Sequence, residues 1–317
     1  MPRSHQLLPP GGLACSIANF LHVGKCIGLA SILPLLWTLP ARAENLTQAD
    51  AWPIELSGGC RLPDGRIVLV DDESRTACFL WDGLAGHLPY RIPLAESLDD
   101  LEAAAADSLG RVYLLTSHSL TKKGHARTDR RHLARLSGLA AGETQGALAQ
   151  KPRFEMADDL LGPLTGALGV AAGAINLEGL AWYPGRDQLL FGVRSPAGGM
   201  VVAMGPVDAL FGQGEPGKPV LHRLDLAGRG VRGLDYDSWQ RLVWVLAGPT
   251  AADTGDFALY LWDPVTDALT SPTVAGLDRV TQPETVVALG PPDAEGRTRL
   301  LVAGEGAEPV VLTAVRH

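Results

Sequence analysis

Charged residues recur near the starts of predicted strands, at a spacing that would gather them in a ring of strands. The residues at these equivalent positions are Gly58-Gly59, Glu102, Glu178, Arg232 and Glu284. Carboxylates held close together raise one another's pKa unless a cation compensates them, and Ca²⁺ accepts carboxylate oxygens in flexible number. The pattern predicts a site for a divalent cation such as Ca²⁺, with Glu102, Glu178 and Glu284 as ligands. The alternative is that these carboxylates form hydrogen bonds between repeats and hold the ring together.

Basic residues near the same strand ends predict a site for an anion. Arg194 ends a predicted strand, and together with Arg232 it can grip a phosphate or carboxylate through paired hydrogen bonds. His118 ends another strand, where it can serve as a general base or metal ligand, or as a hydrogen-bonded structural residue. Lys123 and Arg130 lie in a basic segment that either draws in an anionic ligand or offsets nearby acids. The predicted ligand-binding residues are Arg194, Arg232, His118, Lys123 and Arg130.

Short β-type runs, separated by Gly, Pro and Asp turns, must position these residues. In the clearest repeat, a first strand over residues 176–182 passes through Pro184-Gly185 into a second over residues 188–193. Units of four such strands recur about every fifty residues, which is typical of a propeller. We predict an all-β β-propeller with five four-stranded blades, six being the alternative because the second unit is long. A β-sandwich would explain the short strands but not the recurrent order of turns and polar strand ends.

The two ends of the propeller are predicted to meet in the last blade. The fifth unit runs out of chain after its third strand at residues 309–314, and residues 271–274 are assigned to the fourth unit. Residues 52–56 are free to supply the missing strand, which would tie down ends that otherwise fray. The sequence therefore predicts a ring closed by an N-terminal strand. Residues 158–168 are predicted to form a short helix, with two acids in its first turn.

The N-terminal segment has the features of an export signal. Lys25 precedes an apolar run over residues 26–40, and Ala41-Arg42-Ala43 gives the small-x-small pattern of a signal-peptidase site. The run is shorter than the ~20 residues that a membrane-spanning helix needs. We predict a signal peptide over residues 1–43, a single propeller domain over residues 44–317, and a periplasmic or secreted protein with no membrane span after cleavage.

The charge of the chain limits its partners. Its formal net charge is −8, and loss of the three basic residues of the predicted signal peptide, which has no acid, would make it −11. Such an acidic protein repels phosphates, so nucleic acid is not an expected partner. The sequence also lacks a phosphate loop, a dinucleotide glycine fingerprint and zinc-type cysteine pairs, so no nucleotide cofactor is expected. We expect a monomer that binds a small anionic ligand or a protein segment.

The cysteines and tryptophans are predicted to be structural. Cys60 and Cys78 fall on the first and third strands of one blade, ~9–10 Å apart, whereas a disulfide needs Cα atoms within about 7 Å of each other. Two buried free thiols are therefore favoured over a disulfide. Tryptophans at strand positions are assigned to packing between blades, and these are Trp182, Trp239, Trp244 and Trp262.

Three sets of motifs occur in a fixed order along the chain. Thr116-Ser117-His118-Ser119 is followed by residues 130–135, Asn176-Leu177-Glu178-Gly179 by residues 192–196, and residues 225–234 by 246–249 and 259–262. Together they resemble the bacterial family called domain of unknown function 3616. The resemblance implies a propeller-like exported or cytosolic protein with no established reaction, so it supports the fold and leaves the function open. The last unit departs from the pattern, because Thr285 follows Glu284 where glycine is expected.

Two classes of function fit these patterns. The first is a binding propeller that recognises an anionic small molecule or a partner segment at the mouth of its channel. The second is a metal-dependent hydrolase of a phosphate ester, lactone or carboxylic ester, in which glutamates hold the ion and Arg194 and Arg232 stabilise negative charge. The position of the three glutamate carboxylates discriminates between them. Convergence on a common point favours a metal, whereas hydrogen bonds between blades favour a structural role.

Overall fold

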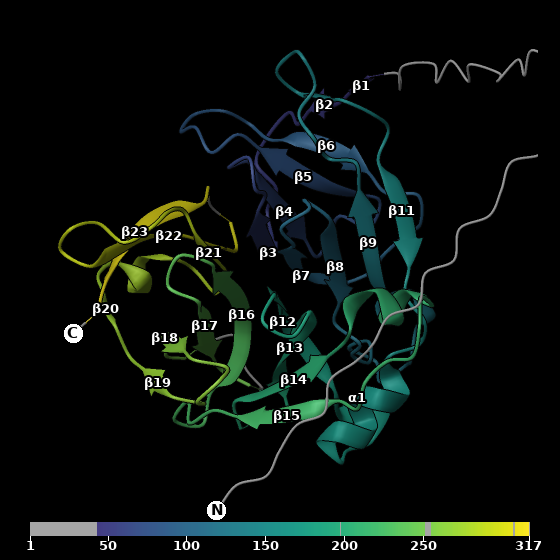
Figure 1. The fold of residues 1–317 in the computed structure, drawn as a ribbon, viewed down its shortest axis with the longest axis vertical. Helices are drawn as coiled ribbons and strands as arrows, with labels where there is room; N and C mark the ends of the chain where they lie inside the picture. The colour runs from purple at the N-terminus through teal and green to yellow at the C-terminus, as the bar shows by residue number, and fades with distance from the viewer. Residues whose placement is uncertain (1–42, 197, 251–254, 307, 317) are drawn as a thin grey trace, which may run out of the picture. The chain divides into compact units, whose positions relative to one another are not determined.

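Five antiparallel sheets surround a central axis in the computed structural model of the protein, which describes residues 43–317 except 197, 251–254, 307 and 317 (Figure 1). In each sheet one strand lies beside the axis, and the five inner strands pack against one another in a closed ring. This arrangement confirms the predicted all-β propeller with five blades. The predicted signal peptide falls almost wholly outside the described residues. No helix of the described part is long and apolar enough to cross a membrane.

The first two blades contain the N-terminal strands. From the axis outwards, the first blade is β3 (Leu56–Arg61), β4 (Ile67–Asp71), β5 (Ala77–Trp81), β6 (Tyr90–Pro93) and β2 (Thr47–Gln48). The second blade is β7 (Leu101–Ala106), β8 (Val112–Thr116), β9 (Leu133–Ser137) and β11 (Arg153–Met156). A separate two-stranded sheet pairs β1 (Glu44–Asn45) with β10 (Ala147–Leu148).

The remaining three blades follow in chain order. The third is β12 (Asn176–Tyr183), β13 (Gln188–Ser195), β14 (Met200–Met204) and β15 (Val220–Arg223). The fourth is β16 (Gly230–Asp237), β17 (Leu242–Gly248), β18 (Ala258–Trp262) and β19 (Leu269–Thr270). The fifth is β21 (Pro283–Ala288), β22 (Arg297–Gly304), β23 (Val310–Val315) and β20 (Thr273–Val274). The described helices are α1 (Leu161–Leu168), shorter than predicted, and the 3-10 turns η1 (Thr128–Arg130), η2 (Ala172–Ala174), η3 (Val207–Phe211) and η4 (Leu277–Arg279).

The predicted closure of the ring by an N-terminal strand is wrong. The outer strand of the fifth blade is β20, where Thr273 pairs with Val315, and not the segment 52–56. Residues 271–274 were expected in the fourth blade, but β19 ends at Thr270. Pro272 follows, and because proline has no N–H for the ladder, pairing stops there and the chain crosses to the next blade. A single β-bridge between Glu55 and Glu305 joins the first and last blades.

Apolar side chains fill the spaces between neighbouring blades. The described residues form five buried clusters, and each cluster combines strands of two adjacent blades. Both faces of an inner or second strand are therefore covered, which explains why β4 and β8 are buried along their whole length, without the polar alternation of a one-sided sheet. Cys60 and Cys78 are both free and buried, as predicted. Trp244 and Trp262 are also buried as predicted, but Trp239 is 41% exposed, so its assignment to the core is wrong.

Candidate functional site

A β-bulge occurs at the same place near the start of each inner strand. The bulges appear as breaks in the register between inner and second strands, and a bulge re-aims the side chain that it leaves unpaired. The residues left unpaired are Ser57, Glu102, Glu178, Arg232 and Glu284. In the first blade the equivalent residue is thus Ser57 and not Gly58-Gly59. Gly58 instead permits a close approach, because a Cβ there would lie 2.6 Å from the Cα of Ala103.

Arg232 joins carboxylates from the neighbouring blades on either side. Its Nε lies 2.9 Å from Oε2 of Glu178, and its Nη2 contacts Oε1 of Glu284. Arg194 adds a second ion pair, with Nη1 2.6 Å from Oε1 of Glu178. Arg232 is fully buried, and a buried charge is tolerated only when it is well paired. Glu178 and Glu284 therefore connect the third, fourth and fifth blades through arginine.

Glu102 completes the group without an ion pair of its own within the described part of the chain. It is 9% exposed, and burial, followed by the charges of Glu178 and Glu284, raises its pKa well above the ordinary value. Burial also raises the pKa of Glu284 to about 8, against the opposing effect of Arg232. Burial and the neighbouring carboxylates therefore favour the protonated form of Glu102, which relieves the repulsion between the carboxyl groups.

Two of the three predicted metal ligands form ion pairs with arginine side chains. Arg232 and Arg194 supply the positive charge that Ca²⁺ was expected to supply at Glu178 and Glu284. Among the residues that the structure describes, the group of three potential metal ligands whose oxygens all lie within 4.8 Å of one another is instead Glu55, Asp72 and Glu73. A metal at Glu102, Glu178 and Glu284 remains a prediction without support from these contacts.

His118 is fully buried beside the second blade. Its Nδ1 donates to the carbonyl oxygen of Thr116 at 2.9 Å, and its backbone adopts a left-handed φ of 58°. Burial lowers the pKa of His118 to about 4, so the imidazole is neutral at physiological pH. These contacts fit the structural alternative better than a general base, since the ring has no access to solvent.

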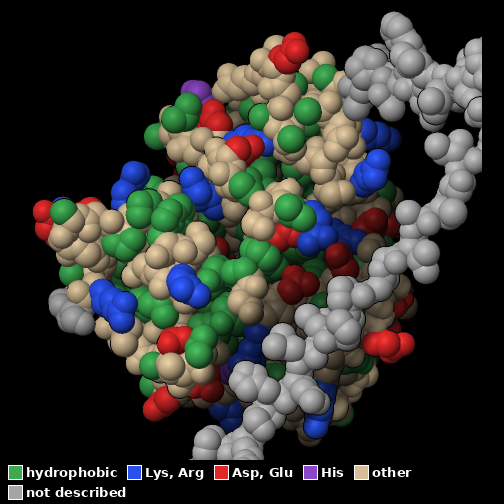
Figure 2. Space-filling model, viewed as in Figure 1, with side chains coloured by type: hydrophobic (Ala, Val, Ile, Leu, Met, Phe, Trp, Pro, Cys, Tyr) green, Lys and Arg blue, Asp and Glu red, His purple; other side chains and the backbone are tan. Residues whose placement is uncertain are grey.

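The predicted basic segment is largely matched by acids. Arg130 lies 2.7 Å from Asp99 and 3.0 Å from Asp100, whereas Lys123 is exposed in a turn. Asp100 also accepts a hydrogen bond from the hydroxyl of Ser117. On the face drawn in Figure 2, acidic and basic side chains are interspersed. The structure therefore does not gather the five predicted anion-binding residues around one open position.

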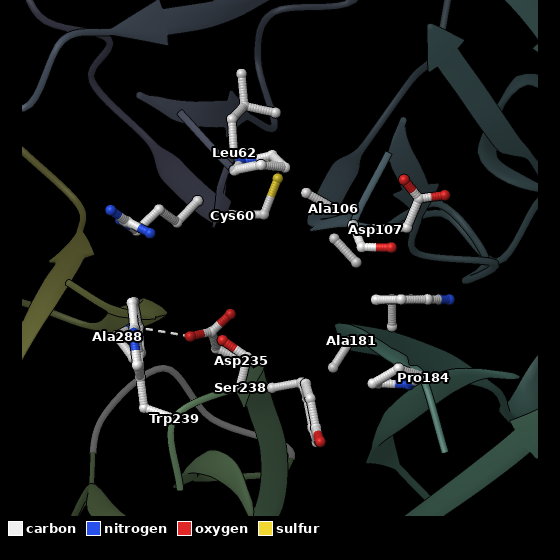
Figure 3. A pocket seen from close by; sticks show the side chains of 16 residues that line it. Cys60, Leu62, Ala106, Asp107, Ala181, Pro184, Asp235, Ser238, Trp239 and Ala288 are labelled. Atoms are coloured by element: carbon white, nitrogen blue, oxygen red, sulfur yellow. Dashed lines mark hydrogen bonds between the residues drawn. The ribbon is translucent and has the colours of Figure 1, made fainter. Parts of the chain in front are cut away.

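A pocket of about 490 Å³ lies at the opposite, carboxyl-terminal ends of the inner strands (Figure 3). All five blades contribute to it, through Cys60, Ala105, Ala181, Asp235 and Ala288. The small side chains of three alanines leave the space open on the propeller axis. A concave site of this volume, in which apolar and aromatic side chains are combined with polar groups, is a common form of small-molecule site.

Asp235 is the polar group that faces the centre of this pocket (Figure 3). Within the described part of the chain, its one hydrogen-bond partner is the backbone N–H of Ala288, 2.7 Å from Oδ2. Burial by the pocket walls raises the pKa of Asp235 to about 7, against the opposing hydrogen bond from Ala288. The carboxyl is thus poised to gain or lose a proton near neutral pH, and Oδ1 is available to a ligand.

The other polar groups of the pocket differ in the hydrogen bonds and ion pairs that they already form. Asp107 is buried and saturated, since Oδ2 accepts from Arg111 Nε at 2.5 Å and from the Tyr113 hydroxyl at 2.8 Å. Burial raises the pKa of the Cys60 thiol well above its ordinary value, so it is neutral. The Arg61 guanidinium lies 5.2 Å from the ring centre of Trp239 and has no ion pair among the described residues.

Sequence reasoning missed this pocket although its signal is present in the repeats. When the blades are aligned on their bulges, the third residue after the bulge is Cys60, Ala105, Ala181, Asp235 and Val287. A lone acid stands where the other blades have small or apolar side chains. Trp182 and Trp239, assigned to the core, also line the pocket.

Fold and site together define a five-bladed propeller with a closed, charged ring at one end of its axis and an open pocket at the other. The profile of a family described as "Protein of unknown function (DUF3616)" matches residues 207–312, which covers the fourth blade and most of the fifth. The resemblance to that family is thereby confirmed for this part of the chain. No curated protein matches the sequence.

Several solved structures are similar to the chain at low sequence identity and with TM-scores below 0.5. One is a nidogen/laminin complex, with 14% identity, 78% of this chain and 72% of that chain covered, and a TM-score of 0.42. Virginiamycin B lyase from Staphylococcus aureus has 11% identity, coverage of 86% and 72%, and a TM-score of 0.39. An aldose sugar dehydrogenase from Streptomyces coelicolor has 12% identity, coverage of 87% and 99%, and a TM-score of 0.42. At this distance the likenesses say nothing about activity.

Proposed function

We propose that the protein is a binding propeller that holds a small organic molecule in the axial pocket. The observation that carries this proposal is the open carboxyl of Asp235 in a pocket of about 490 Å³ with apolar and aromatic walls. A preformed cavity with few convergent polar groups is the arrangement that most small-molecule sites share. Trp182, Tyr236 and Trp239 add large aromatic surfaces that can cover the ligand.

The opposite end of the axis supports binding less well. An anion there would compete with Glu178 and Glu284 for Arg194 and Arg232, and Arg232 has no exposed surface. The same ion pairs argue against a metal-dependent hydrolase, because a metal would have to displace a paired, buried guanidinium at an electrostatic penalty of several kcal/mol. A ligand in the axial pocket would not have to displace Arg194 or Arg232 from these ion pairs. Export of the protein, its monomeric state and the identity of a partner remain predictions.

Thermal denaturation of the full chain in the presence of a set of small metabolites tests the proposal. A ligand that binds only the folded state at about 100 times its Kd adds about 2.7 kcal/mol to the free energy of unfolding, which is a rise of about 5 °C in Tm for a chain of this size. Ala106→Phe places a large ring in the pocket, and Leu109→Phe is the matched control on the exposed turn that follows β7.

We expect compounds that raise the Tm of the wild type and of Leu109→Phe but not that of Ala106→Phe. Two results would overturn the proposal. One is that no compound in the set raises the Tm of the wild type, and the other is that every rise persists in Ala106→Phe.

A further inference from the structure

Two opposite charges in the axial pocket have no ion-pair partner among the described residues. One is the carboxyl of Asp235 on β16, and the other is the guanidinium of Arg61 at the end of β3. They come from blades that are not neighbours in the ring, and no ion pair joins them within 4.0 Å. Asp107, the other charged residue in the wall, is already bound by Arg111 and Tyr113. The pocket thus offers one negative and one positive group at separate places.

On the basis of the binding function proposed above, we propose that the ligand is a zwitterion of amino-acid type. Its ammonium group pairs with Asp235, its carboxylate pairs with Arg61, and its body lies against the aromatic wall. Charge-assisted hydrogen bonds of both kinds are stronger than neutral ones, and a guanidinium can hold a carboxylate through two parallel bonds. The structure gives each ligand charge a separate counterpart that has no ion-pair partner among the described residues.

A ligand with one charge fits the pocket less well. An amine would pair with Asp235, but its positive charge would repel Arg61. A carboxylate would pair with Arg61, but its negative charge would repel Asp235. A neutral ligand would leave both protein charges partly desolvated without a partner, which is unfavourable. Only a ligand that carries both charges compensates both groups.

The surroundings of Asp235 are consistent with this assignment. The groups that can influence its charge are Arg61 on β3, Asp237 on its own strand and the neutral Cys60 thiol, and the largest effect is desolvation by the walls. An ammonium group beside the carboxyl would oppose that desolvation and favour the ionised form. Binding of the zwitterion should therefore release a proton from Asp235 below about pH 7.

The aromatic side chains define where the body of the ligand lies. Trp182 and Tyr236 are half-buried, Trp239 is exposed at the rim, and all three line the pocket with Ala105, Ala181 and Ala288. Such walls cover an apolar or aromatic side chain and offer it few hydrogen bonds. The ligand body is accordingly expected to be apolar.

Calorimetric titration with three probes of similar shape tests the inference. The probes are L-phenylalanine, phenethylamine, which lacks the carboxylate, and 3-phenylpropionate, which lacks the ammonium group, and the other protein amino acids are titrated alongside. We expect an apolar amino acid to bind about tenfold or more tightly than its amine or acid analogue. Asp235→Asn should weaken binding of the amino acid and the amine but not of the acid, and Arg61→Gln should weaken binding of the amino acid and the acid but not of the amine.

Arg91→Gln is the matched control, because Arg91 also stacks on an aromatic ring, at 5.5 Å from the ring centre of Phe79, but lies on β6, the fourth strand from the axis. This variant should bind all three probes as the wild type does. Three results would overturn the proposal that the ligand is a zwitterion. The amine or the acid binds as tightly as the amino acid, neither pocket variant changes the affinity for the amino acid, or no amino acid binds. When other compounds still bind in the pocket by the Ala106→Phe criterion, that failure leaves the binding function standing.

Discussion

Replacement of Asp235 by asparagine should stabilise the protein at neutral and alkaline pH but not in acid. The pKa of this carboxyl is raised from 3.8 to about 7 in the folded protein. A raised carboxyl pKa means that ionisation favours the unfolded state, in which the carboxyl loses its proton at a lower pH than in the folded state. Relative to a group that does not titrate, the folded protein therefore loses stability as the pH rises from about 4 to about 7.

The expected change in the free energy of unfolding follows from the pKa shift of Asp235. A change of about 3 pH units corresponds to about 4 kcal/mol. Because Asp235 faces a pocket that water can enter, screening reduces this value, and we expect about 2 kcal/mol. Asparagine keeps the carbonyl oxygen that accepts the Ala288 N–H, so the hydrogen bond at 2.7 Å survives while the charge is removed.

Urea unfolding of wild type and Asp235→Asn between pH 4 and pH 8 measures this difference. The two proteins should be nearly equally stable at pH 4, and the variant should be about 2 kcal/mol more stable at pH 8. Asp293→Asn is a control, because hydrogen bonds from Arg297 lower the pKa of the exposed Asp293. The stability that this carboxylate contributes is lost only in acid below about pH 4, so this variant should be slightly less stable than the wild type by a nearly constant amount over the range. A difference for Asp235→Asn that stays constant over this range, or a less stable variant at pH 8, would refute the reasoning.

Three further predictions concern the ring and the core. Arg232→Met should lower the free energy of unfolding by about 3–5 kcal/mol, since it removes the ion-pair partner of the buried Glu284 and leaves Glu178 with Arg194 alone. Urea unfolding within about 1 kcal/mol of wild type, roughly the value of one hydrogen bond, would contradict the role of these ion pairs. Trp244→Phe should cost about 1–3 kcal/mol in the same assay, because the buried Nε1–H donates to Asp237 at 3.2 Å. Addition of Ca²⁺ or EDTA should leave the Tm unchanged, whereas a rise with Ca²⁺ that Glu284→Gln abolishes would support the metal site.

The blades could be predicted from the sequence because their inner and second strands obey a strict spacing. A turn with glycine or aspartate follows each inner strand, so the position of Glu178 in one repeat locates Glu102, Arg232 and Glu284 in the others. The outer strands of the last two blades are only two residues long. Such strands carry no periodicity, which is why β20 was assigned to the wrong blade.

The partners of the charged residues could not be predicted from the spacing alone. Convergence of three glutamates suggested a cation, but a bulge turns the side chain of Arg232 towards carboxylates on both sides. The pocket was missed for a different reason. Its shape arises from what alanine side chains leave empty, and Asp235 stands out as an exception only when the five inner strands are aligned on their bulges.

Binding of the best compound from the melting screen to three proteins tests the central claim most directly. These are the wild type, Ala106→Phe at the axial pocket, and Arg194→Gln at the charged ring on the opposite end. If the axial pocket is the binding site, titration gives wild-type affinity for Arg194→Gln and no binding for Ala106→Phe. Binding that persists in Ala106→Phe and disappears in Arg194→Gln would contradict the account and place the ligand at the charged ring.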